Sequence, residues 1–407
     1  MSSFKPNSTA DPLLKPSRIL AARFGVFLMI IAALMSSSIP TLLYPVYQDH
    51  WRTSTAWTSV MFATYAIAVI GALICSREIE KYFRDRKVLI YLAGFCICTG
   101  LVIAASAHGP GTMLAGRALC GLGTGCLMGC ANAALYELDP HRSLRSASLY
   151  STLAFTLGSG IGPLLSGYCL NKGLSPLSLP YMLACATCMV AIVLVGRTPM
   201  LIPRAVSNNT GSHARLDKQS SKLFWVAAWA LVTGWCVGSV FMACGAKIVR
   251  DLAHIDDPLI GALLVSAFQL TAGMGQILGR FTSSFTSVTI GVSVVCTGQL
   301  GMAAAASSGM AIFFSLACAV AGVGYGVAFE GANSLVSSIA RLESRSWLAS
   351  KFYIYGYIFG NVVPSLATGL LTDVFGLLTA LSSFTAVVAG MSVVCLILVR
   401  RAAKCTS

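Results

Sequence analysis

The chain has 407 residues, of which 56% are hydrophobic and only 10% are charged, and its mean hydropathy is +0.77. This composition is too apolar for a soluble globular domain and excludes that class. The formal net charge is +14, but the basic residues are spread over many short connections, which argues against a nucleic-acid-binding surface.

Twelve apolar stretches are long enough to cross a membrane as helices. The first six run Phe24–Tyr44, Trp57–Ser76, Val88–Ala107, Met113–Leu135, Ala147–Leu170 and Leu179–Val195. The second six run Leu223–Cys244, Leu259–Leu278, Val288–Ala306, Ala311–Leu335, Leu348–Leu371 and Gly376–Val399. We therefore predict a tail over 1–20, a six-helix bundle over 21–196, a polar linker over 197–222, a second bundle over 223–400, and a tail over 401–407.

Basic residues indicate the orientation of the chain in the membrane. If both termini and the linker are cytoplasmic, 23 of the 28 Lys and Arg residues lie on the cytoplasmic side. The remaining five are Arg117, which lies within a span, and Arg52, Lys172, Lys247 and Arg250. Because cytoplasmic loops carry an excess of Lys and Arg, we expect both termini to be cytoplasmic.

An internal repeat relates the two halves. The pattern Gly121-Leu-Gly123-Thr-Gly125 with Ala131-Asn132 returns 201 residues later as Gly322-Val-Gly324-Tyr-Gly326 with Ala332-Asn333, and the same offset carries Pro163 onto Pro364. Close helix packing in lipid favours recurring glycines by itself, but it does not account for the shared Asn and Pro. The repeat predicts an all-α polytopic membrane protein of two six-helix, pseudo-symmetric bundles, an arrangement common among transporters.

Two ionisable residues stand out inside predicted spans, where charge is costly and usually faces the protein interior or water. Arg117 lies in the fourth span and Glu330 in the tenth. A carboxylate in an apolar cavity binds protons more readily than one in water, so Glu330 is a candidate for proton coupling together with Arg117. Two structural interpretations of Glu330 remain open: hydration near the cytoplasmic end, or an ion pair with a loop arginine such as Arg341.

Two motifs resemble a known family. Arg117-Ala-Leu-Cys-Gly121-Leu-Gly123 is similar to the fourth-helix motif of the major facilitator superfamily, and the stretch from Gly158 through Gly162, Pro163 and Gly167 resembles the fifth-helix motif of its drug:proton antiporters. The segments around Pro40 to Tyr47 and Tyr136 to Pro140 resemble a bacterial, efflux-like branch. The resemblance implies the twelve-helix fold of that superfamily, a bacterial inner-membrane location, and proton transfer that involves the arginine.

The loop after the second span departs from the family pattern, which places an aspartate and several arginines there as a cytoplasmic gate. The aligned residues of this chain are Arg77, Glu80, Lys81, Asp85 and Arg86, with Lys81 in place of the aspartate. A lysine would repel the helix N-terminus that the aspartate meets in family members. Either the latch is rebuilt with exchanged charges, or gating is weaker than in the family.

The leading functional hypothesis is proton-coupled export of a small organic compound by alternating access, with substrate bound between the bundles. We expect the first, fourth, seventh and tenth helices to line the cavity, through Pro40, Tyr44, Asn132, Trp235, Tyr325 and Asn333. The alternative is metabolite uptake by proton symport or facilitated diffusion, in which Arg117 would bind a substrate carboxylate. A non-transporting receptor on the same scaffold is a third hypothesis.

The remaining expectations concern chemistry and partners. No Ser, Cys or His pattern predicts catalysis, so we expect no enzyme activity, no catalytic residue, no cofactor and no metal site. The expected partners are the small-molecule substrate, protons and the lipid bilayer, without nucleic acid. We expect the protein to act as a monomer.

Overall fold

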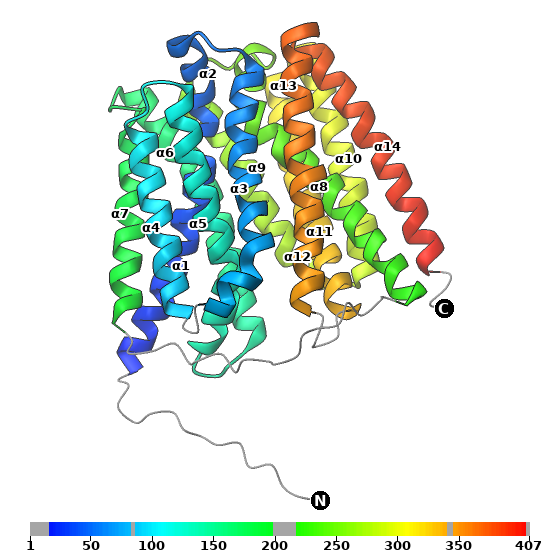
Figure 1. Ribbon diagram of the computed structural model, residues 1–407. Coiled ribbons are helices and arrows are strands. Elements are labelled where there is room, and N and C mark those ends of the chain that lie inside the picture. The colour runs from blue at the N-terminus through cyan, green and yellow to red at the C-terminus, as the bar shows by residue number, and fades with distance from the viewer. Residues whose placement is uncertain (1–15, 83–85, 198–216, 340–344, 404–407) are drawn as a thin grey trace, which may run out of the picture.

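The computed structural model describes residues 16–82, 86–197, 217–339 and 345–403, and all of its regular elements are helices. Two bundles lie side by side in Figure 1. The N-terminal bundle comprises α1 (Pro16–Ser38), α2 (Pro40–Trp51), α3 (Thr55–Tyr82), α4 (Arg86–Ala105), α5 (Pro110–Glu137), α6 (Leu144–Lys172) and α7 (Leu179–Gly196). The C-terminal bundle comprises α8 (Lys218–Asp251), α9 (Pro258–Gly279), α10 (Ser284–Ser308), α11 (Ala311–Ile339), α12 (Arg345–Tyr355), the π-helix η1 (Gly356–Val362), α13 (Val363–Phe375) and α14 (Leu377–Ala403).

The described residues contain twelve candidate membrane spans, as the sequence predicts, because α1 with α2 forms one span and α12, η1 and α13 form another. Large apolar side chains such as Phe95, Phe281 and Ile312 are more than half exposed on the outside of the bundles. Such a surface is suited to lipid and not to water. The beginning of α1 and the end of α14 lie on the same side of the molecule, here called the terminal side, and the opposite side is called the far side (Figure 1).

The first span is interrupted where α1 ends and α2 begins. Pro40 is the first residue of α2, and a proline has no N–H to donate to the carbonyl four residues earlier, that of Ser36. A buried carbonyl that loses its helical partner needs another donor. The hydropathy pattern does not show this interruption, because the apolar residues continue across it.

The eleventh span contains the second irregularity. Its middle, Gly356–Val362, is π-helical, and Pro364 follows in the first turn of α13. Pro364 leaves the carbonyl of Gly360 without its helical donor, and the hydroxyl of Ser239 on α8 donates to that carbonyl at 2.8 Å. This bond joins the irregular segment to the neighbouring helix. Single π-turns of this kind are frequent at functional sites.

The repeated glycines bring helices of each bundle into close contact. A Cβ atom added at Gly326 on α11 would collide with the backbone carbonyl oxygen of Ala272 on α9. At Gly121 on α5 the equivalent collision is with the carbonyl oxygen of Tyr65 on α3. Glycine is therefore required at these two positions by the approach of another backbone.

Candidate substrate cavity

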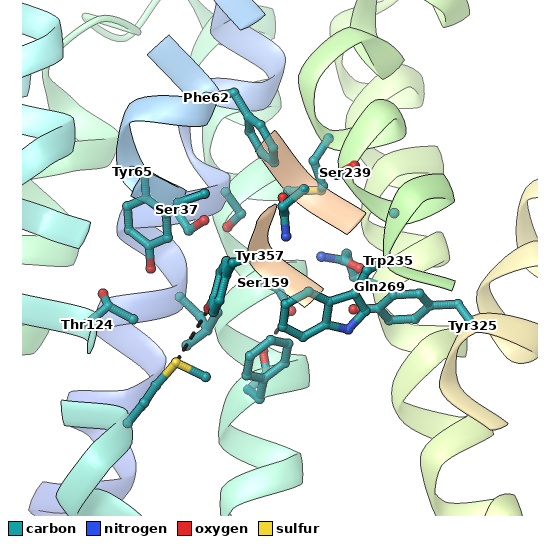
Figure 2. Close-up of a pocket in the computed structure, with 18 residues that line it drawn as sticks. Ser37, Phe62, Tyr65, Thr124, Ser159, Trp235, Ser239, Gln269, Tyr325 and Tyr357 are labelled. Carbon is teal, nitrogen blue, oxygen red and sulfur yellow. Dashed lines mark hydrogen bonds between the residues drawn. The ribbon is translucent and has the colours of Figure 1, made fainter. Parts of the chain in front are cut away.

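A cavity lies between the two bundles, in the middle of the spans. It contains about 730 Å³ of space between atoms, including the part open to solvent. The lining residues are Leu34, Ser37, Ser38, Phe62, Tyr65, Ala66, Thr124, Met128, Phe155, Ser159, Trp235, Gly238, Ser239, Met242, Gln269, Tyr325, Tyr357 and Asn361. Figure 2 shows Tyr65 and Thr124 of one bundle facing Trp235, Gln269 and Tyr325 of the other, with Tyr357 between them.

The offset of 201 found in the sequence pairs residues across this cavity. Adding 201 to 34, 37, 38 and 124 gives 235, 238, 239 and 325, and all eight of these positions line it: Leu34 with Trp235, Ser37 with Gly238, Ser38 with Ser239, and Thr124 with Tyr325. The two halves thus present equivalent helix positions to the same space. Apart from Ser38 and Ser239 the paired side chains differ, and the aromatic members, Trp235 and Tyr325, come from the C-terminal half.

The predicted cavity residues occupy different places. Trp235 and Tyr325 line the cavity, whereas Pro40, Tyr44, Asn132 and Asn333 are not among its lining residues. Tyr44 is buried within α2, and its hydroxyl has no hydrogen-bond partner among the described residues. Asn132 is exposed on α5 and Asn333 is partly exposed on α11. The lining also extends beyond the four expected helices to α3, α6, α9 and η1.

Several lining residues did not stand out in the sequence. From the sequence alone, Gln269 and Asn361 look like polar residues that form hydrogen bonds between neighbouring helices. Tyr357 looks like an aromatic residue at the membrane interface. Their position within a span is a signal, because a polar side chain at membrane depth needs a partner or water. The sequence alone does not distinguish a neighbouring helix from a cavity as that partner.

Arg117 lies behind the cavity wall and not in it. Its side chain is 1% exposed, and its Nη1 donates to the carbonyl oxygens of Ser36 at 2.9 Å and Ser37 at 3.1 Å, next to the break between α1 and α2. Its Nε donates to the carbonyl of Met61 on α3 at 3.1 Å. The guanidinium lies 4.7 Å from the ring centre of Tyr65, which separates it from the cavity. Arg117 therefore supplies the donor that Pro40 cannot.

Glu330 lies on α11 next to the end of α9. Its Oε1 is 3.6 Å from Nε of Arg280, and both side chains are largely buried. Arg280 also donates from Nη2 to the hydroxyls of Thr152 at 2.9 Å and Ser148 at 3.1 Å, both on α6. The ion pair is thus connected to a hydrogen bond between the bundles. Arg341, the partner considered from the sequence, lies outside the described residues.

The fifth-span motif on α6 makes contacts on two sides. At Gly158, an added Cβ would lie 2.6 Å from the carbonyl oxygen of Ile31 on α1, and at Gly162 it would collide with the Ser38 hydroxyl. At Gly167 it would collide with the Ala262 side chain on α9, in the other bundle. Pro163 lies between these contacts. The motif places α6 against its own bundle and against the opposite one.

Of the predicted gate residues, Arg86 is described in full. It forms an ion pair with Glu137 at the end of α5, within the N-terminal bundle. The backbone of Arg77, Glu80 and Lys81 belongs to α3, but their side chains lie outside the described part, and Asp85 lies outside it altogether.

The loop after α5 adds a second local pair. Asp139 lies 3.2 Å from Nη2 of Arg23 on α1 and accepts from the backbone N–H of His141 at 3.0 Å. Burial raises the pKa of Asp139, but the His141 N–H, the Ser146 hydroxyl and Arg23 outweigh burial, so its pKa lies below the ordinary value. Asp139 is thus a charged anchor between α1 and the loop, and not a proton carrier.

On the far side, a carboxylate joins the two bundles. Asp373 near the end of α13 accepts hydrogen bonds from the backbone N–H groups of Thr55 and Ala56, each at 2.9 Å. These N–H groups belong to the first turn of α3, which has no intrahelical acceptors for them. The carboxylate also lies at the positive end of the α3 dipole. Asp373 is therefore an N-terminal cap supplied to α3 by the other bundle.

Comparisons with known proteins agree with this architecture. Residues 26–364 match the family model described as Major Facilitator Superfamily. A bacterial homologue of the human lysosomal transporter Spinster, inward-facing and occupied, superposes with a TM-score of 0.74 at 15% identity over 96% of this chain and 98% of its own. A variant of the nucleoside transporter NupG superposes with a TM-score of 0.75 at 12% identity, over 94% of this chain and 99% of its own.

A third structure, a POT family transporter in complex with 5-aminolevulinic acid, gives a TM-score of 0.75 at 9% identity over 94% of this chain and 96% of its own. At these identities the likeness shows the fold alone. No curated protein matches the chain.

Proposed function

Because the chain belongs to the major facilitator superfamily, we propose that it is a secondary transporter that exports a small organic compound in exchange for protons. The observation that carries this proposal is the cavity between the bundles, lined by both halves at equivalent positions. Alternating access requires such a site at the interface of two repeats that move against each other. The structures similar to this one are those of transporters, which fits a protein without enzyme activity.

The proposed proton site is Glu330. It is a carboxylate within a span, separate from the cavity lining, so that substrate and proton would occupy different places. Protonation of Glu330 would neutralise the partner of Arg280, whose other nitrogen binds α6 in the opposite bundle. A change in proton occupancy would therefore reach the interface that has to move. Arg117 would contribute by holding the break between α1 and α2.

Uptake by proton symport or facilitated diffusion is the second candidate. If Arg117 were to bind a substrate carboxylate in this mechanism, its guanidinium would have to give up its hydrogen bonds to three backbone carbonyls. The same cavity would serve a carrier of either direction. Direction and coupling must therefore be measured on the purified protein.

The test uses proteoliposomes with the pH-sensitive dye pyranine inside and a neutral heteroaromatic probe, 2-quinolone, added outside. Exchange of the entering probe for protons raises the internal pH, whereas symport lowers it, whichever way the protein is inserted. We expect a rise, and no rise with Glu330→Gln. Internal acidification would establish symport and overturn the proposed exchange, and probe entry faster than into protein-free liposomes with no pH change would establish facilitated diffusion.

A further inference from the structure

The wall of the cavity carries no side chain of Asp, Glu, Lys, Arg or His among its eighteen lining residues. Six of them are aromatic: Phe62, Tyr65, Phe155, Trp235, Tyr325 and Tyr357. A charged ligand would lose hydration at this depth without meeting a counter-ion, which is costly. Flat apolar groups, in contrast, are stabilised by contact with aromatic faces and edges.

The polar groups of the wall divide into two sets. The hydroxyl donors of Ser38, Ser159, Ser239 and Thr124 are engaged with backbone carbonyls. The side-chain amides of Gln269 and Asn361, in contrast, form no hydrogen bond with any described residue, and the buried Nε1–H of Trp235 has no acceptor. These three groups are among the donors left available to a ligand.

Trp235 is held in place by its surroundings. Its ring lies 4.9 Å from that of Tyr357 in an edge arrangement and 6.1 Å from that of Phe329. A Cβ added at Gly360 would approach its Cβ to 2.7 Å, so the backbone of η1 packs directly on this residue. An immobile, buried N–H without an acceptor lowers stability unless a ligand supplies that acceptor.

A fixed positive charge behind one of the lining rings disfavours cations. Arg117 is positive and lies behind Tyr65, and the lining offers no carboxylate against it. An anion would be attracted by this charge but would have to reach it past the Tyr65 ring. The unengaged donors of the cavity therefore match an acceptor on a neutral molecule.

We propose that the cavity binds an uncharged, planar heteroaromatic compound, whose ring packs among the six aromatic side chains and whose acceptor atom binds the Nε1–H of Trp235. Gln269 and Asn361 bind the polar edge of the same molecule. Figure 2 shows the Gln269 amide next to the Trp235 ring on one side of the cavity. This inference rests on the proposed function, because it names the substrate class of the same site.

The experiment measures equilibrium binding to the purified full-length protein by isothermal titration calorimetry, without any gradient. The probes share one bicyclic size: 2-quinolone (neutral, with acceptor), naphthalene (neutral, without acceptor), quinoline-2-carboxylate (anion) and N-methylquinolinium (cation). We expect 2-quinolone to bind at least tenfold more tightly than each of the others. Trp235→Phe keeps the ring but removes the donor, and should weaken 2-quinolone about tenfold while leaving naphthalene unchanged.

The matched control is Trp225→Phe, at an exposed tryptophan outside the cavity, which should leave all four affinities unchanged. Gln269→Leu should also weaken 2-quinolone selectively. Tightest binding by the anion or the cation, failure of all neutral probes to bind, or equal binding by Trp235→Phe would overturn the inference. Binding as expected without proton exchange in proteoliposomes would instead defeat the proposed coupling and leave the substrate class standing.

Discussion

Two charged residues within the spans have different surroundings, and these define what each side chain does. Arg117 donates to three backbone carbonyls, so its described contacts are those of a structural donor. Among the described residues Glu330 pairs with one cation, Arg280, and a carboxylate can change its charge. Of the two, Glu330 is therefore the residue that we propose as the proton carrier.

Replacement of Arg117 by Ala should lower stability as well as transport. The carbonyls of Ser36, Ser37 and Met61 would lose their charged donor, at a cost of about 1–3 kcal/mol for each carbonyl left unpaired. We expect an inserted protein with a lower unfolding midpoint and transport reduced at least tenfold. Arg117→Lys keeps a charged donor and should recover part of the stability. The recovery should be incomplete, because an ammonium lacks the planar fork of the guanidinium.

Thermal unfolding in detergent and transport in proteoliposomes check this prediction. An Arg117→Ala protein with an unchanged midpoint would show that other groups satisfy the helix break. Retained gradient-driven transport in that variant would remove Arg117 from the coupling mechanism.

Replacement of Glu330 by Gln should flatten the dependence of transport on pH. The amide is neutral at every pH, so the charge that faces Arg280 no longer varies. The matched control is Glu137→Gln, which breaks an ion pair with Arg86 inside one bundle and should keep the wild-type pH profile. Initial rates from pH 5 to 9 provide the measurement, and identical profiles for Glu330→Gln and wild type would assign Glu330 a structural role.

At the scale of helices, the sequence is most informative where a pattern reflects a backbone requirement. Twelve apolar stretches predict twelve spans because each span must satisfy its own backbone hydrogen bonds in lipid. The repeated glycines predict close helix contacts, and the structure has them at Gly121 and Gly326. The break before Pro40 and the π-helix before Pro364 were not predicted, since local proline effects do not alter hydropathy.

Substitution of Gly326 by Ala should separate α9 from α11. The new methyl group would meet the carbonyl oxygen of Ala272, and overpacking of this kind costs about 1–3 kcal/mol. Gly129, on α5, is the matched control because an added Cβ there meets nothing within 4 Å. We expect a lower unfolding midpoint for Gly326→Ala and an unchanged or slightly raised one for Gly129→Ala. Equal midpoints would show that α9 and α11 tolerate a wider spacing.

For the whole molecule, the sequence indicated the two halves and their equivalence, and the structure shows where they meet. The offset of 201 already contained the pairing of Leu34 with Trp235 and of Thr124 with Tyr325. Gln269 and Asn361 could not be selected in this way, because the residues at the equivalent positions, Ala68 and Gly160, are not polar. The contacts of a side chain that lies between two bundles depend on how the bundles pack against each other, and the hydropathy pattern does not encode that packing.

Loss of the Asp373 carboxylate should favour opening of the far side. The carboxylate caps α3 from the other bundle, and removal of a helix cap costs about 1 kcal/mol, or roughly a fivefold shift between closed and open forms. Asp49→Asn is the control, because its pair with Arg250 is long, at 3.7 Å, and exposed.

The readout is labelling of Ser59→Cys by a membrane-impermeant maleimide in a background without the fifteen native cysteines. Ser59 is buried against Gly369 on α13, so it becomes reachable when this contact opens. We expect Asp373→Ala to be labelled about five times faster than Asp49→Asn. Equal rates would show that the cap does not hold the far side closed.

The absence of charged side chains from the cavity lining also has an electrical consequence. When a neutral solute leaves in exchange for one proton, each turnover carries one net positive charge inward. The membrane voltage then contributes about 2.3 kcal/mol per 100 mV in addition to the pH difference. Such a carrier would continue to expel its solute in cells whose internal and external pH are equal, as long as they remain electrically polarised.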